Sequence, residues 1–452
     1  MPNGFDFCYN KHILSLHTLM KESLTMNTIA YKCPCCGAPL TYSSASNKME
    51  CASCGNSYDI EAIEAMKTDE QQAVGVQFEI PTDTFNADDA GGMQAFVCKN
   101  CGAELMTEDT TTATECPYCG SPTILPDRIE GGVKPEMVIP FTVTKEQAHQ
   151  AFNNYFKGKR LLPNIFLNTR NRIAEMRKLY VPYWLFHCDA HGSIAYDAEK
   201  SQTERQGDWE ITRTRHYLVR REGSMRFENI PVDGSEKLDN RITESLEPYD
   251  MSAAVPFKAA VLAGALADHA DVDADACRGR AVERVEASVS NTLRNTVNGY
   301  TSVTERSRNI YAEDGKVTPV LMPVWLITTE KEGKTYTFAI NGQTGKLTCD
   351  VPVDKKKALA WGGSVFAGVL GLSALILALV NHLAGGTLLL AVIFAAIIAL
   401  VVVGCLKGQL KQAVHQSAAE NYMQKDSFDL HVHVDHFLYE TTQRRKIETK
   451  KD

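Results

Sequence analysis

The sequence lacks the short motifs that mark many catalytic sites. It has no G-x-S-x-G nucleophile elbow, no H-E-x-x-H metalloprotease motif and no Rossmann dinucleotide fingerprint. Residues 341–346 resemble a phosphate-binding loop, but their spacing differs from G-x-x-x-x-G-K-S/T and the β-like flanks predict a hairpin turn. We therefore expect a non-enzymatic protein with no small-molecule substrate. A catalytic site assembled only by folding stays an open alternative.

Residues 1–25 lack the basic start and apolar block of a secretory signal peptide. The 14 cysteines are therefore expected in a reducing compartment, where cysteines are more often metal ligands or core residues than disulfides. Met26 lies just before the first organised motif. We interpret residues 1–25 as a non-native or disordered extension, with Met1 and Met26 as alternative start positions.

Two long segments near the C-terminus contain no Asp, Glu, Lys, Arg or His: residues 358–380 and 387–406. A helix of about 20 residues crosses the hydrocarbon layer, and only a helix satisfies its own backbone there. We predict two transmembrane helices that form a hairpin, with a pair of buried core helices as the alternative. Because no ionisable residue lines these segments, they are not expected to form a transport pathway.

The charges beside the hairpin predict its orientation. Lys355, Lys356 and Lys357 precede the first segment, Lys407 and Lys411 follow the second, and the connector carries no Lys or Arg. Positive charge stays on the cytoplasmic side of a membrane. We expect a two-helix protein of the cell membrane with both termini in the cytoplasm.

Eight cysteines form two copies of one pattern, CxxCG followed 14 residues later by another CxxCG. The second copy lies 65 residues after the first, so the sequence is internally duplicated. The candidate ligands are Cys33, Cys36, Cys51 and Cys54 in residues 26–66, and Cys98, Cys101, Cys116 and Cys119 in residues 93–127.

This spacing is typical of zinc ribbons, in which two knuckles supply four thiolates to a tetrahedral ion. Four protein ligands leave no open position, so we predict two structural zinc sites, each of which supplies the folding energy of its ribbon. Redox chemistry of the CxxC motifs is the alternative. Cys35 is surplus, because pairing Cys33 with Cys36 reproduces the spacing of the second copy.

The ribbon region is acidic rather than basic. Residues 26–128 contain 5 Lys or Arg and 15 Asp or Glu, and an acidic linker is expected at 67–92. Phosphate binding needs a basic face. We therefore favour protein contact over nucleic-acid binding for the ribbons.

Residues 128–355 are expected to form a duplicated α+β domain, with halves at 128–248 and 249–355. Val138–Phe141 is matched to Ala254–Phe257, and the segments around Trp184 and Trp325 are matched at an offset of 141 residues. Each half should lay one helix on an antiparallel sheet. The first helix begins at a Thr144–Gln147 capping box, and the second carries Val285, Val289 and Leu293 on one face. We interpret both tryptophans as core residues rather than ligand-stacking residues.

The tail, residues 407–452, is expected to begin as an amphipathic helix through Met423 and to continue as a strand. His431, His433 and His436 lie in that strand, where an exposed edge is favoured over a metal site. The basic end near Arg444 would be attracted to anionic lipid. The residues of a nucleic-acid-binding alternative cluster in the first half: Arg213, Arg215, Arg220, Arg221 and Arg226.

The paired CxxCG ribbons, the Tyr180–Phe186 segment, the Glu247–Asp250 segment and the closing membrane helices resemble a bacterial family. Its members are membrane-anchored double zinc-ribbon proteins, often labelled "transcription factor B-type zinc ribbon" or "primosomal replication helicase-like". The resemblance covers most of residues 26–450. It implies a role in envelope stress or membrane organisation beside flotillin-like (SPFH-domain) or phage-shock-type proteins. The helicase label has no support, because the chain has no Walker motif.

Together these features predict a multidomain fold. It comprises two small β zinc ribbons, a duplicated α+β domain and an α-helical transmembrane hairpin. The expected function is a membrane-anchored scaffold that recruits another membrane-associated protein at the cytoplasmic face. The alternative is a membrane-tethered nucleic-acid-binding regulator.

Overall fold

A computed structural model describes residues 31–66, 78–85, 93–108, 115–121, 124–127, 133–167, 176–331, 334–380, 385–410 and 413–447. The extension expected at 1–25 lies outside these residues. The helices are α2 (Ile60–Ala65), α3 (Lys145–Phe156), α4 (Asn164–Leu167), α5 (Asn240–Leu246), α6 (Ala274–Asn295), α7 (Lys355–Leu379) and α8 (Gly385–Gly408). Three short 3₁₀ helices are η3 (Met251–Ala253), η4 (Ala259–Leu262) and η5 (Glu420–Tyr422).

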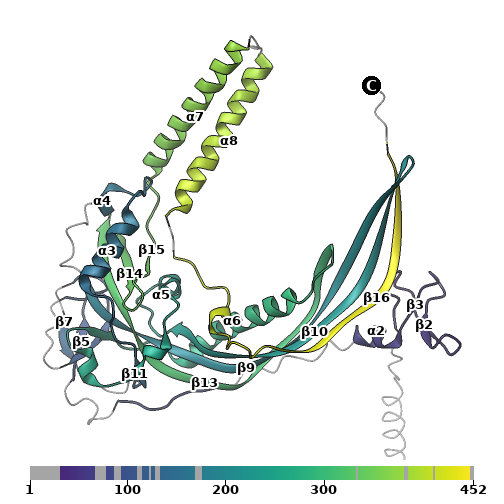
Figure 1. The fold of residues 1–452 in the computed structure, drawn as a ribbon. Coiled ribbons are helices and arrows are strands. Elements are labelled where there is room, and N and C mark those ends of the chain that lie inside the picture. The colour runs from purple at the N-terminus through teal and green to yellow at the C-terminus, as the bar shows by residue number, and fades with distance from the viewer. Residues whose placement is uncertain are drawn as a thin grey trace, which may run out of the picture.

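Four long strands form most of a curved sheet (Figure 1): β9 (Arg177–Gln206), β10 (Trp209–Asp233), β13 (Ser302–Lys331) and β16 (Asp429–Lys446). The shorter strands of this sheet are β4 (Phe78–Glu79), β5 (Met93–Cys98), β6 (Glu104–Glu108), β7 (Ile124–Asp127), β8 (Met137–Val138), β11 (Val255–Pro256), β12 (Leu266–Asp268), β14 (Lys334–Asn341) and β15 (Leu347–Cys349). The sheet is mixed rather than purely antiparallel, because β12 runs parallel to β9, and β4 and β8 run parallel to β13.

The two halves of the α+β region share this one sheet. Strands β9 and β13 pair antiparallel, and Val181 lies opposite Met322, its own counterpart at the 141-residue offset. The pairs between Arg177–Leu326 and Leu185–Thr318 match one another about this point, so a local two-fold axis relates this part of the repeats. Instead of two separate sheets, as the sequence was expected to form, the halves join at this axis.

The helices are exchanged between the halves. Helix α3 precedes β9 in the chain but packs with Trp325 and Phe338 of the second half, whereas α6 packs with Trp184 and Phe186 of the first. Each helix therefore covers the strands of the other repeat, and neither half can bury its apolar residues alone.

Both tryptophans are core residues, with Trp184 2% and Trp325 3% exposed. The indole of Trp184 donates to the Val272 carbonyl at 2.8 Å, and that of Trp325 donates to the Val143 carbonyl at 3.0 Å. Each acceptor directly precedes a helix N-cap, Asp273 of α6 or Thr144 of α3. The expected capping box between Thr144 and Gln147 is confirmed.

One matched landmark was wrong. The structural counterpart of Met137–Val138 is Leu266–Ala267, because β8 pairs with β13 as β12 pairs with β9. Val255–Pro256 instead pairs with β8 itself. The offset of this part of the repeat is therefore 129 residues rather than 116.

The two cysteine-rich segments are joined to the sheet differently. The first forms its own three-stranded sheet of β1 (Thr41–Ser43), β2 (Lys48–Glu50) and β3 (Ser57–Tyr58). In the second, β6 pairs with β12, so β5, β6 and β7 extend the main sheet. Within the expected linker 67–92, β4 pairs with β13 and Phe85 is buried, so this part is attached to the body.

The apolar segments form two adjacent helices, α7 and α8, that stand away from the sheet (Figure 1). Both are long and apolar enough to cross a membrane. The expected amphipathic helix through Met423 is wrong, because α8 ends at Gly408 and residues 413–419 have no regular structure. This segment bonds elsewhere: Val414 N–H donates to Ser245 Oγ and Ala419 N–H to Ser288 Oγ.

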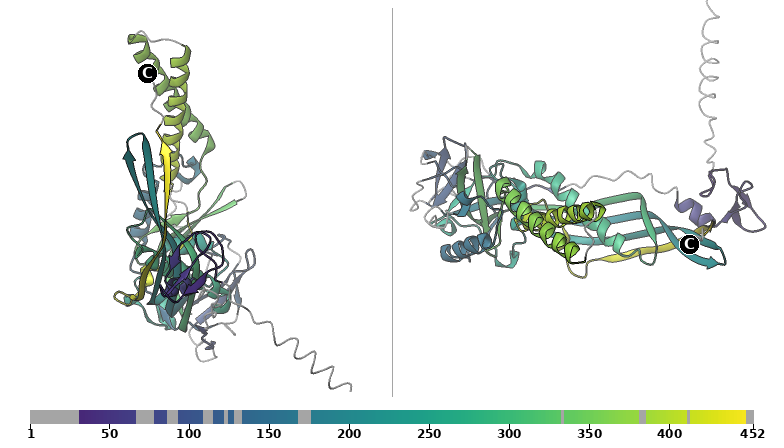
Figure 2. Two further views of the ribbon diagram at one scale, coloured as in Figure 1. Left: turned by 90° about the vertical axis from the view of Figure 1, so that its right-hand side faces the viewer. Right: turned by 90° about the horizontal axis from the view of Figure 1, so that it is seen from above.

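The far ends of β9, β10 and β16 form an extended arm, which we define as residues 196–206, 209–219 and 435–446. In Figure 1 and in the left view of Figure 2, the arm and the α7–α8 hairpin rise from the same side of the curved sheet. Helix α6 packs on the concave face between them. The first cysteine-rich segment lies against the outer face of the arm, where it contacts Ala195, Leu218 and Leu438.

Candidate metal centres

The four CxxCG knuckles share one backbone conformation. In each, the glycine N–H donates to the carbonyl of the first cysteine at 2.8–2.9 Å. The four glycines have φ between +69° and +75°, which is the left-handed region that glycine adopts without steric cost. The glycine after each second cysteine is therefore required by the turn that brings two thiols together. The knuckles begin at Cys33, Cys51, Cys98 and Cys116.

The structure brings all eight candidate ligands into two groups of four. In the first group, Cys33 Sγ lies 3.6 Å from Cys54 Sγ and Cys36 Sγ lies 3.5 Å from Cys51 Sγ. In the second, the corresponding distances are 3.7 Å and 3.6 Å. Cys35 is exposed and lies outside the group, as the sequence predicts.

These distances fit one ion surrounded by four thiolates. Four sulfurs at about 2.3 Å from a tetrahedral zinc ion lie about 3.8 Å from one another. Disulfide sulfurs would lie about 2.05 Å apart, so these pairs are not disulfides. Each group can hold a metal ion, and its four protein ligands leave no open coordination position for catalysis.

The cysteines of each group differ in how readily they form the thiolate that binds metal: the pKa values of Cys36 and Cys101 are raised to about 11, whereas at least one thiol of each group has a lowered pKa. Burial raises the pKa of Cys33, but hydrogen bonds from Tyr58 and the backbone amides of Cys36 and Cys35 outweigh it and lower the pKa to about 6. Burial likewise raises the pKa of Cys119, and hydrogen bonds from Asn100 and Ser121 lower it to about 7. Each group thus contains a thiol that loses its proton readily.

The groups differ in their surroundings. In the first, Cys36 and Cys54 are exposed, and Tyr58 OH lies 3.0 Å from Cys33 Sγ. In the second, Cys98 and Cys116 are fully buried and the other two cysteines are half-buried. The second group therefore lies inside the protein core, whereas the first has an edge that faces solvent.

A buried hydrogen-bond network attaches the second group to the main sheet. Tyr118, within the last knuckle, donates to Asp268 of β12, which also accepts from Ser235 Oγ at 2.6 Å. Burial raises the pKa of Asp268 to about 7, although these hydrogen bonds lower it in part. Sequence reasoning missed Tyr58 and Tyr118. At the 65-residue offset, the counterpart of Tyr58 is Thr123 and that of Tyr118 is Ser53. A tyrosine present in only one copy was the signal that could have identified both residues.

Comparison with known proteins finds a relative that aligns with most of the chain. This chain is 34% identical over 358 residues to "Uncharacterized protein YdjG" of Bacillus subtilis (strain 168), an alignment that covers 79% of this chain and 99% of YdjG. The chain belongs to the YdjG family. No family model matches the chain, and no solved structure matches it. Almost the whole of YdjG is included in the alignment, and its name assigns no activity.

The arginines considered for nucleic-acid binding all pair with carboxylates in this YdjG-family structure. Their partners are Glu204 for Arg213, Glu440 for Arg215, Glu222 for Arg220, Asp435 for Arg221 and Asp189 for Arg226. The guanidinium of Arg221 is also only 1% exposed. These five side chains therefore do not form the free basic face that phosphate binding needs.

The histidines of the tail lie in β16. Among the described strands it pairs with β10 alone, so it is the edge strand of the arm. His431 and His433 are exposed, and His431 Nε2 lies 3.0 Å from Ser224 Oγ. Among the described residues, no group of metal-ligating side chains forms at this strand. The edge-strand interpretation fits this placement.

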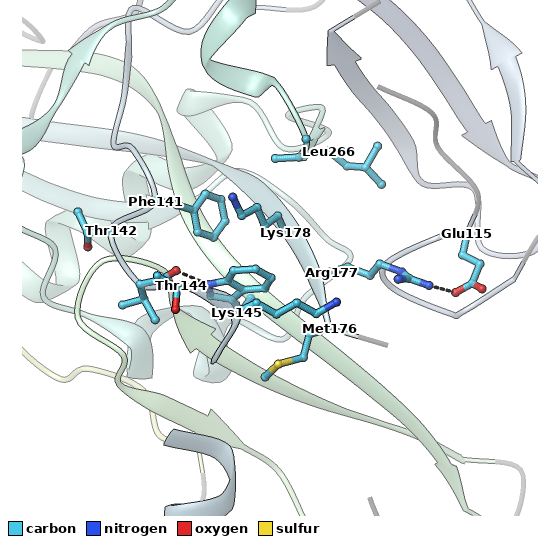
Figure 3. A pocket seen from close by; sticks show the side chains of 13 residues that line it. Glu115, Phe141, Thr142, Thr144, Lys145, Met176, Arg177, Lys178 and Leu266 are labelled. Carbon is cyan, nitrogen blue, oxygen red and sulfur yellow. Dashed lines mark hydrogen bonds and ion pairs between the residues drawn. The ribbon is translucent and has the colours of Figure 1, made fainter. Parts of the chain in front are cut away.

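A cavity of about 540 Å³ lies where α3 begins, beside the second group. Figure 3 shows Lys145, Arg177 and Lys178 around it, with Arg177 paired to Glu115. Lys178 Nζ lies 5.2 Å from the ring centre of Phe141. Three cations and one carboxylate can attract an anion. Of the two lining threonines, Thr142 Oγ1 donates to Gln343 O and Thr144 Oγ1 accepts from Gln147 N–H.

Proposed function

We propose that this protein is a non-enzymatic, membrane-anchored scaffold whose first zinc ribbon, residues 26–66, recruits another protein. The observation that carries the proposal is the contrast between the two cysteine groups. The first has its own small sheet on the outer face of the arm, with two exposed ligands and with Tyr42 55% exposed. A module held in this way can be contacted by a partner without disturbing the main sheet.

Zinc is the metal we propose for both groups. Four thiolates in a tetrahedral arrangement are typical of structural zinc, and each CxxCG pair closes the site. The zinc would fix the ribbon fold and take no part in a reaction, because it has no open position.

The hairpin would cross the cell membrane, with the connector outside and both termini in the cytoplasm. Lys355, Lys356 and Lys357 at the start of α7 and Lys407 at the end of α8 support this orientation. It places both ribbons and the curved sheet at the cytoplasmic face. A partner would then be a protein of the same face, and the family resemblance suggests a flotillin-like or phage-shock-type protein.

The test uses full-length protein in its native membrane with a photoreactive p-benzoylphenylalanine at position 42. We expect light to produce one specific protein adduct that is lost in C36S/C54S, which opens the first ribbon. The same group at Tyr311, which is 40% exposed on the main sheet, is the matched control and should give no such adduct.

The proposal fails if position 42 gives no protein adduct while the zinc content and membrane location are intact. An adduct with DNA or RNA instead would support the nucleic-acid-binding alternative. The carboxylate partners of the five candidate arginines of β10 argue against that outcome.

A further inference from the structure

The hairpin is joined firmly to the body, so the body has a defined orientation beside a membrane. Asp354 N–H donates to the Leu161 carbonyl at 2.9 Å, just before α7 begins. The Arg160 guanidinium lies 4.4 Å from the ring centre of Trp361 in the second turn of α7. Trp and basic residues gather at membrane interfaces. These contacts therefore mark the level at which the cytoplasmic leaflet meets the body.

The arm reaches toward that same leaflet. In Figure 1 and in the left view of Figure 2, its free end rises on the side from which the hairpin leaves. The concave face of the sheet opens toward this side (Figure 1). Tyr217 and Val219 of β10 pack with α6 on this face, so strand alternation puts the other odd-numbered residues of β10, back to Trp209, on it as well.

The end of the arm, residues 204–211 and 444–446, carries an exposed aromatic residue beside two cations. On the concave face Trp209 lies opposite Lys446, and Ile211 lies opposite Arg444. Trp209 is 46% exposed, whereas Trp184 and Trp325 are buried. Arg444 and Lys446 are exposed and form no ion pair with any described residue.

The next cations along this face are neutralised. Arg213 pairs with Glu204 and Arg215 with Glu440. A further cation of this face, Lys200, packs against the rings of Tyr217 and Tyr300. Arg444 and Lys446 thus stand at the end of the arm without a carboxylate or aromatic partner among the described residues, although the protein as a whole has a net charge of −8. An indole flanked by cations matches the interface of an anionic bilayer, where the ring sits at headgroup level and the cations meet phosphate.

We propose that the end of the arm is a second membrane contact that binds anionic phospholipid headgroups through Trp209, Arg444 and Lys446. The site rests on the proposed membrane insertion of the hairpin, which holds the arm at high effective concentration beside the leaflet. Each basic residue near an anionic surface strengthens binding roughly five-fold. A lipid surface is favoured over nucleic acid because the free basic patch is small and faces the side on which the hairpin lies.

The test places p-benzoylphenylalanine at position 209 of the full-length protein in nanodiscs. One set contains phosphatidylglycerol with phosphatidylcholine, and the other contains phosphatidylcholine alone. Lipid adducts are counted by mass spectrometry after illumination. We expect adducts in the anionic discs, at least ten-fold fewer in R444Q/K446Q, and a change of less than two-fold in R215Q/E440Q, which removes one ion pair and leaves the net charge unchanged. Both double variants replace two charged side chains of the same face.

Phe437 supplies the positional control, because it is 51% exposed on β16 but lies farther from the end of the arm. Its adducts should be few in both lipids. Equal adducts at 209 in both lipids, no adducts at all, or equal losses in the two double variants would overturn the proposal. Preferential adducts with added DNA would overturn it as well. Failure of the protein to enter nanodiscs would instead contradict the proposed membrane insertion of the hairpin, and therefore the proposed function.

Discussion

The two cysteine groups use the same spacing and the same knuckles but are held by different parts of the fold. The group at Cys33 belongs to a separate three-stranded sheet that rests on the arm through one apolar contact surface. The group at Cys98 belongs to strands that continue the main sheet, and it shares a core with Leu179 and Val324. One duplicated motif has thus become an attached module in one copy and part of the body in the other.

The spacing of the cysteines therefore predicts where a metal site forms, but not whether that site supports a separate module or the main sheet. A closed four-thiolate site contributes folding energy wherever it stands. Whether its loss affects a small module or the whole body depends on strand pairing outside the motif.

The largest difference is expected between two equivalent double variants, C98S/C116S and C33S/C51S. A structural zinc site supplies about 10 kcal/mol or more of folding free energy, comparable with the stability of a whole domain. C98S/C116S should therefore expose the sheet from β5 to β12, whereas C33S/C51S should release only residues 31–66. Hydrogen exchange followed by mass spectrometry measures both. In the sheet, β9 adjoins β12 and β13 adjoins β9, so the amide hydrogens of both strands should exchange faster in C98S/C116S than in C33S/C51S. Equal exchange in the two variants would show that the copies are equivalent.

The next effect concerns the buried carboxyl that anchors the second copy. Because burial raises the folded-state pKa of Asp268 to about 7, above its ordinary value, its stabilising contribution is present at low pH and is lost as pH rises through 7. Between pH 5 and pH 8, the stability of D268N relative to the natural protein should rise by roughly 2–3 kcal/mol. The measurement is the difference in thermal midpoint at each pH. A constant difference would contradict the assignment.

A smaller effect separates the two tyrosines that support the groups. Y118F removes a buried donor to Asp268 and should destabilise the body by about 1–3 kcal/mol without changing the zinc content. Y58F removes the hydrogen bond to Cys33 and should weaken zinc binding in the first copy by roughly 10–100-fold. Chelator competition and thermal unfolding distinguish them. The comparison fails if both variants change the same quantity.

The smallest effect is expected for the surplus thiol. Cys35 is exposed and lies outside the ligand group, so C35S should leave the zinc content unchanged and alter stability by less than about 0.5 kcal/mol. C36S, one residue away, should abolish zinc binding in the first copy. Zinc analysis of the purified variants measures both, and loss of zinc in C35S would mean that Cys33 pairs with Cys35 instead.

Local patterns predicted the local parts of this fold. The cysteine spacing identified both groups, the charge-free segments identified both long apolar helices, and Thr144 with Gln147 identified the start of α3. Each of these depends on residues near one another in the chain. Local chemistry alone therefore determines them.

The remaining features depend on long-range pairing. The helices are exchanged because β9 and β13 pair around Val181 and Met322, and no local pattern reports that register. The tail after α8 has helical periodicity in its sequence but is not helical, because its backbone bonds to Ser245 and Ser288 of neighbouring helices. The support of the second group by Asp268 also crosses about 150 residues of chain, as its bond to Tyr118 shows.

The most direct test of the comparison is native mass spectrometry of the full-length protein in detergent during titration with a zinc chelator. The purified protein should carry two zinc ions. The first should leave at low chelator concentration from the exposed group at Cys33, with the body still protected, and the second should leave only as the body unfolds. Protein without zinc, or loss of both ions in one step, would contradict the account.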